Sequence, residues 1–210
     1  MSKQNEGQNR LFPIFLKLEH LQTLLVGGGN VGLEKLEALL KNSPEAEITL
    51  VADFVKDEVQ QLAALHPRVN ILHRKFEMAD LENKDMVVLA TDNPSLHAQI
   101  RQETRKRRIL TNVADTPDLC DFYLGSVVRK GDLKIAISTN GKSPTMAKRL
   151  RQFFEEFFPD NMQDILLNLR SLREQLKGDF QHKLKVLEEV TASFAPSQKS
   201  SQQEKEITHL

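Results

Sequence analysis

The sequence has few of the features that mark secreted, membrane-spanning or nucleic-acid-binding proteins. It contains one cysteine, Cys120, which excludes an internal disulfide and is consistent with a reducing cytoplasm. It has no apolar run of about 18 residues, the length that a membrane-spanning helix needs, and residues 1–10 lack the apolar core of a signal peptide. The 29 basic and 29 acidic side chains balance, which disfavours a general nucleic-acid binder. We therefore expect a globular cytoplasmic protein.

Patterns that bind metals are also scarce. The six histidines are scattered, without paired spacing such as His-x-x-x-His. A lone cysteine is more often a small buried residue than a ligand. We predict no metal site formed by the protein.

Hydrophobic periodicity predicts alternating strands and helices in the first half of the chain. A short apolar strand at 23–26 leads into Gly27-Gly28-Gly29, and helical spacing begins at Val31. The strand, glycine turn, helix and next strand at 47–51 form a βαβ unit, which implies a parallel sheet with right-handed crossovers. Further strands are predicted at 69–73, 86–90 and 109–113, helices at 55–65 and 94–108, and an edge or irregular strand at 11–16, where Pro13 interrupts the run.

The pattern changes after Asp115. Two β-rich runs, 122–129 and 132–138, are joined by Lys130-Gly131, which predicts a strand pair. Ser143 as N-cap and Pro144 at the first helical position begin a helix that ends at about Phe158. Amphipathic helices follow over 162–194 with a break near Gly178, and the polar stretch 195–210 is predicted to be disordered.

The spacing Gly27-x-Gly29-x-x-Gly32 between a strand and a helix is typical of a dinucleotide-binding turn. Gly27 would permit a sharp exit from the strand, Gly29 would let a pyrophosphate approach the backbone, and Gly32 would let the helix pack closely. Asn30 and Val31 open the helix, whose free N–H groups attract phosphates. The competing interpretation is a plain structural turn.

An acidic residue follows the second strand. Asp53, 24 positions beyond Gly29, could accept hydrogen bonds from the adenosine ribose and favour NAD by repelling the 2′-phosphate of NADP. The competing interpretation is a solvated surface aspartate. Phe54 is expected near the adenine. Thr91 follows the strand at 86–90, at the edge where open α/β sheets bind ligands, but Asp92-Asn93-Pro94 also reads as an ordinary helix cap.

Three motifs in order give a more specific indication. They are Gly27-Gly28-Gly29-Asn30-Val31, Asn112-Val113-Ala114-Asp115, and the run from Ala136 to Pro144. Over residues 11–190 they resemble the dehydrogenase/ferrochelatase module of sirohaem synthase. The resemblance implies a homodimer that oxidises precorrin-2 to sirohydrochlorin with NAD; some members also insert ferrous iron. Larger members carry a fused methyltransferase domain, for which we expect this chain to be too short.

The resemblance also implies a domain organisation and a fold class. We expect an α/β protein with a Rossmann-like parallel sheet, a β-containing dimerisation region and a C-terminal helical domain. The expected boundaries are a flexible leader at 1–10, the NAD-binding domain at 11–115, the dimerisation region at 116–145, the helical domain at 146–194 and a disordered tail at 195–210.

Asp115 is the candidate catalytic residue. It follows the strand at 109–113 and should lie at the carboxyl edge of the sheet. From the residues alone, an Asp-Thr-Pro turn in which the aspartate caps the backbone is the better explanation. The resemblance implies instead that Asp115 is the general base. A partly buried carboxylate would suit that role, because desolvation raises its pKa.

The loop before the helix at Pro144 is the candidate substrate site. Precorrin-2 carries many carboxylates, and a loop leading into a helix N-terminus can bind anions. Thr139 corresponds to a serine that is phosphorylated in one family member. The loop residues assigned to the substrate are Ser138, Thr139, Asn140, Gly141, Lys142 and Ser143.

Two further clusters have simpler explanations. The basic run 105–108 is expected to be a solvated helix end, where cations oppose the negative end of the helix dipole. Phe153, Phe154, Phe157 and Phe158 recur at helical spacing and are expected to be core or dimer contacts. Two departures from the family pattern, Glu34 for an arginine and Gly125 for a proline, remove no candidate catalytic group.

A function of another class is compatible with the glycine turn. A non-catalytic NAD-sensing regulatory module would also contain a Rossmann unit and dimerise. Such a module would need neither Asp115 nor the loop at 138–143.

Overall fold

The computed structural model describes residues 9–178 and 180–192. The chain divides into two compact units, one made of Met1–Val127 with Ala136–Arg151 and the other of Val128–Ile135 with Gln152–Leu210. The predicted tail at 195–210 and nearly all of the predicted leader lie outside the described residues, and the other domain boundaries stay predictions. No helix in the described part of the chain is long and apolar enough to cross a membrane.

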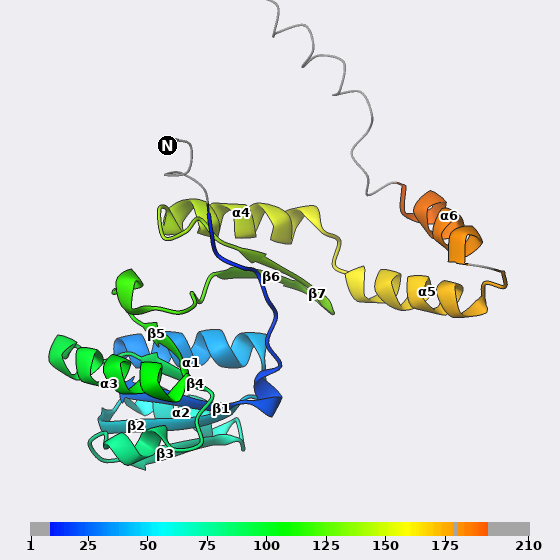
Figure 1. Ribbon diagram of the computed structural model, residues 1–210. Coiled ribbons are helices and arrows are strands. Elements are labelled where there is room, and N and C mark those ends of the chain that lie inside the picture. Colours follow the sequence, from blue (N-terminus) through cyan, green and yellow to red (C-terminus); the bar gives the residue numbers. More distant parts are fainter. Residues whose placement is uncertain (1–8, 179, 193–210) are drawn as a thin grey trace, which may run out of the picture. The chain divides into compact units, whose positions relative to one another are not determined.

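The first unit contains a five-stranded parallel sheet in the order β3-β2-β1-β4-β5 (Figure 1). The strands are β1 Gln22–Gly28, β2 Glu47–Val55, β3 Val69–His73, β4 Met86–Leu89 and β5 Leu110–Val113. The order runs outward from β1 in one direction and from β4 in the other, so the chain changes direction between these two strands. Ligands of open α/β sheets bind at such a switch point, outside the carboxyl ends of the strands. The predicted α/β fold class is confirmed.

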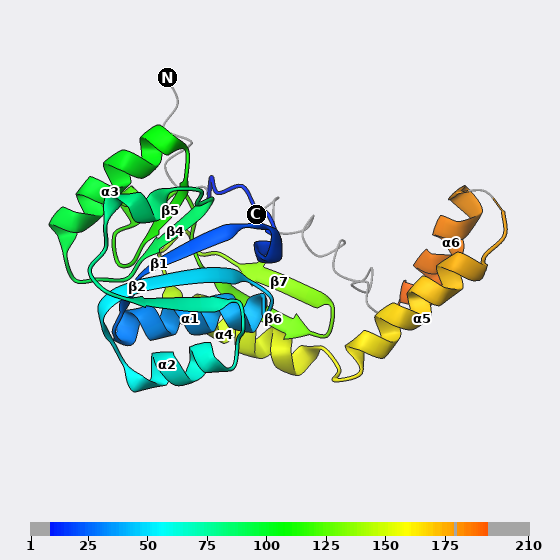
Figure 2. The same cartoon turned by 90° about the horizontal axis from the view of Figure 1, so that it is seen from below.

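Alternating side chains on the strands build two cores, one on each face of the sheet. In β1, Leu25 packs into the layer that contains Leu36 of α1 and Val59 of α2. Its neighbour Leu24 packs into the opposite layer, with Ile100 of α3. The helices are α1 Asn30–Asn42, α2 Asp57–Ala64 and α3 Pro94–Arg107, and Figure 2 shows α1 and α2 side by side.

The first apolar run is not a strand, which corrects the prediction for 11–16. Residues 9–17 have no regular structure, and Phe12 and Phe15 are exposed. Pro13 has no backbone N–H to donate to a sheet, which explains the difference. The 3-10 turn η2 (Leu18–His20) precedes β1 and buries Leu18 against the core below α1.

The second strand is longer than predicted and ends at Val55. Pairing between β1 and β2 shifts between Val26 and Gly28, after which Gly28 pairs with Val55. Asp53 and Phe54 therefore belong to β2 and lie where its register with β1 shifts. Helix α2 begins two residues later than predicted.

The hairpin and the helices after it form as predicted, but the first strand of the hairpin begins at Ser126, four residues later than predicted, because residues 122–125 have no regular structure. Strands β6 Ser126–Lys130 and β7 Leu133–Ile137 pair, and Gly131 takes a φ of +60° in the turn between them. Helix α4 is Pro144–Phe157, and Ser143 Oγ accepts a hydrogen bond from the Met146 N–H at 3.2 Å, as expected of an N-cap. Helices α5 Met162–Gln175 and α6 Phe180–Thr191 are separated near Gly178.

The described contacts of the second unit tie the hairpin turn to the start of α5. The Asp132 N–H donates to Gln163 Oε1 at 2.7 Å, and Gln163 Nε2 donates to Asp132 Oδ2 at 3.0 Å. A Cβ on Gly131 would lie 2.2 Å from Gln163 Oε1. The turn therefore needs glycine both for its backbone conformation and for this contact.

Candidate active site

The glycine turn lies at the switch point, where β1 ends between β2 and β4. Gly27 has a φ of +113°, and a Cβ there would lie 2.5 Å from the Ala90 carbonyl oxygen after β4. A Cβ on Gly32 would lie 2.2 Å from the Gly27 carbonyl oxygen. These two glycines let the strand turn and the helix pack at distances that a side chain would prevent.

Gly28 and Gly29 differ in what surrounds them. A Cβ on Gly28 would lie 2.6 Å from the Phe54 carbonyl oxygen, so this glycine lets β1 approach β2. A Cβ on Gly29 would meet no described atom within 4 Å. The φ of this residue is −83°, a value that residues with a side chain also adopt. The space in front of Gly29 is therefore open, which fits a dinucleotide pyrophosphate.

The start of α1 is prepared for an anion. No side chain caps Gly29, and the described first turn of the helix contains no acidic residue. The N–H groups of Asn30 and Val31 thus remain available to a phosphate. Asn30 Oδ1 accepts a hydrogen bond from Lys56 Nζ at 2.9 Å. Lys56 was not predicted as a site residue, although its position three residues after Asp53 was a usable signal.

Two predicted cofactor residues lie at the end of β2. Asp53 and Phe54 are both exposed, Phe54 to 67 %. They lie between the pairs Val26–Val51 and Gly28–Val55, where the register of β1 and β2 shifts. The Lys56 N–H donates to the Gly28 carbonyl at 3.0 Å. The structure therefore brings these side chains to the same sheet edge as the glycines.

Thr91 also lies at this edge and has a buried partner. Its Oγ1 is 2.8 Å from His97 Nε2, and its methyl carbon would be 3.2 Å from a Cβ on Gly27. His97 is buried, and burial lowers the pKa of its imidazole, which therefore stays neutral near pH 7. Its role was not predicted, because its contact with Thr91 arises only when α3 packs against the sheet.

The segment 92–94 forms the cap of a helix, which was predicted as the alternative to a ligand-binding segment. Asn93 Oδ1 accepts a hydrogen bond from the Leu96 N–H at 3.0 Å, and Pro94 is the first residue of α3. At the other end of α3, Glu103 pairs with Lys106 at 3.0 Å and with Arg107 at 2.9 Å. All four residues of the basic run 105–108 are exposed, as expected of a solvated helix end, and two of them pair with Glu103.

Asp115 lies in a tight turn directly after β5. The Ala114 N–H donates to the Leu89 carbonyl at 2.9 Å, which keeps the end of β5 beside β4. Asp115 takes a φ of +56°, a conformation that aspartate and asparagine tolerate better than most residues. Its side chain is exposed, whereas a partly buried carboxylate was expected. The described chain therefore leaves this carboxylate open to solvent.

Residues on both sides of the turn hold it in place. Asn112 Nδ2 donates to the Phe122 carbonyl at 2.8 Å, and Cys120 Sγ accepts from the Val113 N–H at 3.2 Å. Asp121 accepts hydrogen bonds from Nη1 and Nη2 of buried Arg101, the first at 2.7 Å, and from the Thr111 N–H at 3.0 Å. These contacts close the loop on the sheet.

The Cys120 thiol is partly buried and bonded to the main chain. Burial raises the pKa of its thiol, which therefore stays protonated at neutral pH. Its Sγ donates to the Val113 carbonyl at 3.2 Å. A protonated thiol engaged with the main chain is a poor metal ligand.

The loop before α4 is folded on itself. Thr139 Oγ1 donates to the Ser143 carbonyl at 3.1 Å and accepts from the Ser143 N–H at 3.2 Å. Asn140 and Gly141 both have positive φ, and the Asn140 N–H donates to Ser138 Oγ at 3.1 Å. The side chain of Lys142 is exposed. The loop thus presents Lys142 while its hydroxyl groups maintain its shape.

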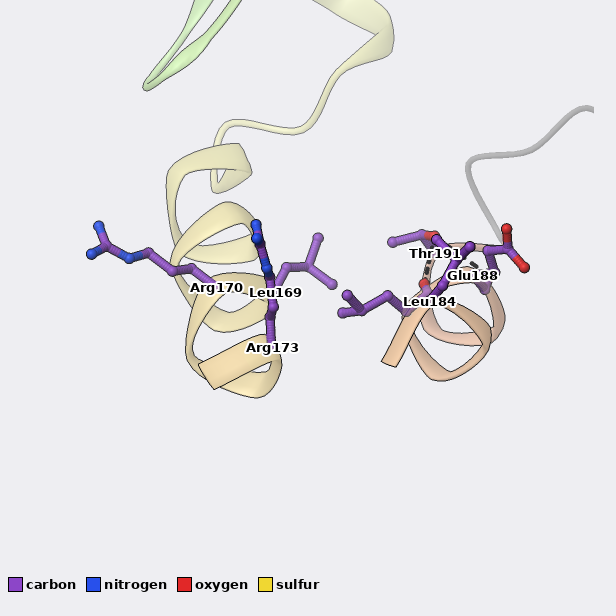
Figure 3. Close-up of a pocket in the computed structure, with 7 residues that line it drawn as sticks. Leu169, Arg170, Arg173, Leu184, Glu188 and Thr191 are labelled. Carbon is purple, nitrogen blue, oxygen red and sulfur yellow. Dashed lines mark hydrogen bonds between the residues drawn. The ribbon is translucent and has the colours of Figure 1, made fainter. Parts of the chain in front are cut away.

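Two hollows in the described chain lie apart from these residues. A groove of about 430 Å³ between α5 and α6 has Leu169 and Leu184 facing one another across it (Figure 3). Arg170, at its margin, pairs with Glu174 at 2.9 Å. The other hollow, of about 470 Å³, includes Asn83 and Lys84. Neither is lined by a predicted site residue. The glycine turn and Asp115 lie instead at the carboxyl edge of the sheet, after β1 and β5.

Two family models match the chain. One, described as "Putative NAD(P)-binding", matches residues 14–126, and the other, "Sirohaem biosynthesis protein central", matches residues 130–156. Residues 127–129 of β6 lie between the two matches, which together cover the parallel sheet, most of the hairpin and most of α4.

Curated relatives and a solved structure extend the comparison. Siroheme synthase of Pseudoalteromonas atlantica is 37 % identical over 169 residues, covering 80 % of this chain and 36 % of the relative. That of Pseudoalteromonas translucida is 35 % identical over 170 residues, covering 81 % and 35 %. This chain therefore spans about a third of the length of these relatives. The structure of SirC, precorrin-2 dehydrogenase, is 24 % identical with a TM-score of 0.68, covering 86 % of this chain and 89 % of that one, and shows the same fold.

Proposed function

Because the chain belongs to the family described as "Putative NAD(P)-binding" and also matches the central model of sirohaem biosynthesis proteins, we propose that it is an NAD-dependent dehydrogenase that oxidises precorrin-2 to sirohydrochlorin. One observation carries the proposal. The glycine turn after β1 and the Asp115 turn after β5 lie at the same edge of one sheet, separated by β4 alone. A cofactor on the first turn and a proton acceptor on the second would flank a substrate between them.

The reaction removes a hydride and a proton from the macrocycle. When bound, the nicotinamide supplies the hydride acceptor. The Asp115 carboxylate is proposed to take the proton, because it is exposed at the sheet edge on a turn held by Asn112 and Cys120. The macrocycle itself would provide the desolvation that the chain does not.

The glycine turn and the end of β2 are proposed to hold NAD. The open space at Gly29 and the free N–H groups of α1 fit the pyrophosphate. Asp53 would accept hydrogen bonds from the ribose hydroxyls and would repel a 2′-phosphate, which favours NAD over NADP. The proposed cofactor residues are Gly27, Gly28, Gly29, Asn30, Val31, Asp53, Phe54 and Thr91.

The loop at 138–143 is proposed to bind carboxylates of the substrate. Lys142 is exposed, and Lys148 and Arg149 are exposed in the first turns of α4. Three cations beside a helix N-terminus form a favourable environment for a polyanionic macrocycle.

A second copy of the chain is proposed to cover α4. Met146, Leu150, Phe153 and Phe157 recur at intervals of four, three and four residues, and all are exposed in the single chain. Phe153 and Phe157 stack with ring centroids 6.0 Å apart. Such an apolar stripe on one helix face supports a homodimer, which light scattering of the parent protein and of Phe153→Asp would test.

The decisive experiment follows NADH formation by purified protein with precorrin-2, comparing NAD with NADP. Asp115→Asn keeps the shape and tolerates the positive φ, so we expect turnover to fall by about 10²- to 10⁴-fold with unchanged NAD affinity. Asp118→Asn, an exposed carboxylate of the same loop, is the matched control and should retain activity.

Each other outcome is informative. Unchanged turnover in Asp115→Asn would remove this residue from the chemistry. Parent protein that binds NAD without oxidising precorrin-2 would favour the NAD-sensing module. A parallel reaction with sirohydrochlorin and ferrous iron, read by absorbance, tests the metal-insertion activity that the resemblance implies for some members.

A further inference from the structure

The positive charge of Lys56 lies beside two helix N-termini and is offset by Glu58, an exposed acidic residue in the first turn of α2. Lys56 is the N-cap residue of α2, and its ammonium group lies against Asn30, the first residue of α1. Both neighbouring helix ends are N-termini, which carry partial positive charge and favour anions over cations. The ammonium therefore opposes two helix dipoles.

The contacts of Lys56 fix it beside the glycine turn. Its N–H donates to the Gly28 carbonyl at 3.0 Å, and its Nζ donates to Asn30 Oδ1 at 2.9 Å. Its side chain is 28 % exposed, and its charged partner is Glu58 at 3.1 Å, itself 56 % exposed. An ion pair this accessible contributes little to stability. A ligand that brings negative charge to the start of α1 would remove the conflict.

We propose that Lys56 is a binding residue for the diphosphate group of the dinucleotide, and that its ammonium turns from Glu58 to the phosphate oxygens when the cofactor binds. This inference rests on the proposed function. Lys56 would add a charge-assisted contact to the uncharged N–H groups of Asn30 and Val31. The pairing with Asn30 favours the diphosphate at α1 over a 2′-phosphate, which would lie near Asp53.

The test measures binding by calorimetry at low salt, using the full chain. Lys56→Met keeps the apolar stem and removes the charge. We expect its affinity for NAD and for ADP-ribose to fall about tenfold, while its affinity for adenosine, which has no phosphate, stays the same. The loss should shrink as salt concentration rises, since salt screens the ammonium.

Two further variants separate this role from a structural one. Glu58→Gln frees the ammonium and should raise the affinity for ADP-ribose, whereas the double variant should behave as Lys56→Met. Lys84→Met is the matched control, because Lys84 Nζ also donates to a neutral oxygen, Thr49 Oγ1 at 2.9 Å, away from the glycine turn. It should bind ADP-ribose as the parent does. The thermal midpoint of unliganded Lys56→Met should not fall.

Several results would overturn the inference. Equal losses for adenosine and ADP-ribose would indicate a general structural effect, and a loss confined to NADP would assign Lys56 to the 2′-phosphate. Unchanged ADP-ribose affinity in Lys56→Met would reject the contact while leaving the proposed function standing. Parent protein that binds neither NAD nor ADP-ribose would overturn both.

Discussion

Replacing Gly29 with alanine should separate cofactor binding from stability. A Cβ at this position meets no described atom within 4 Å, and the φ of −83° is open to alanine. Alanine reduces the entropy of the unfolded chain, which stabilises by about 0.4–1 kcal/mol. It is also a poorer N-cap than glycine, at a cost of about 0.5–1 kcal/mol. The two effects nearly cancel, so the free energy of unfolding should change by less than about 0.5 kcal/mol.

The same methyl group should harm cofactor binding, because it occupies the space that fits the pyrophosphate. We expect the Kd for NAD to rise at least about tenfold, equivalent to about 1.4 kcal/mol. Gly32→Ala is the contrasting variant. Its Cβ would lie 2.2 Å from a backbone oxygen, so α1 must move away from β1. We expect a loss of stability of about 3 kcal/mol or more.

Urea unfolding and calorimetric titration with NAD measure the two quantities on the same preparations. If Gly29→Ala binds NAD like the parent, the diphosphate lies elsewhere than in front of Gly29. If Gly29→Ala is as unstable as Gly32→Ala, the space in front of Gly29 is not open.

Two further predictions concern the buried polar groups. Arg101→Met should lower the free energy of unfolding by about 2 kcal/mol. This is less than the loss expected on breaking a fully buried ion pair, because the Asp121 side chain is 32 % exposed. A change below about 0.5 kcal/mol in urea unfolding would show that the pair is not stabilising. The pKa of His97 is lowered by burial, so its contribution to stability is present above its unfolded value of 6.5 and is lost as pH falls below it. Unfolding free energies measured from pH 8 to pH 5 should decline for the parent more than for His97→Gln, and parallel curves would contradict the assignment.

The strands of the sheet could be predicted because each is marked by residues that are neighbours in the sequence. Buried strands such as 86–89 are continuous apolar runs, and the glycine spacing marks the turn between β1 and α1. The failure at 11–16 is also physical. Apolar residues there predicted a strand, but a strand needs a partner and a backbone donor, and Pro13 lacks the donor.

The partners of the candidate site could not be predicted, because they depend on packing between distant elements. Arg101 meets Asp121 across 20 residues and Lys56 meets Asn30 across 26. Sequence spacing does not indicate which polar side chains will face each other once α3 and β2 are in place. Asp115 itself was identified through a motif resemblance, and neither its exposure nor the contacts that hold its turn could be deduced from that motif.

The single cysteine offers an intrinsic reporter on the region that carries Asp115. The Cys120 thiol is held by the Val113 main chain, and its raised pKa makes it slow to react with disulfide reagents. Since the sequence has no other thiol, the labelling rate reports on this one loop, without any engineered probe. A ligand that closes over the sheet edge would slow that chemistry, and the loop could be timed in the unmodified protein.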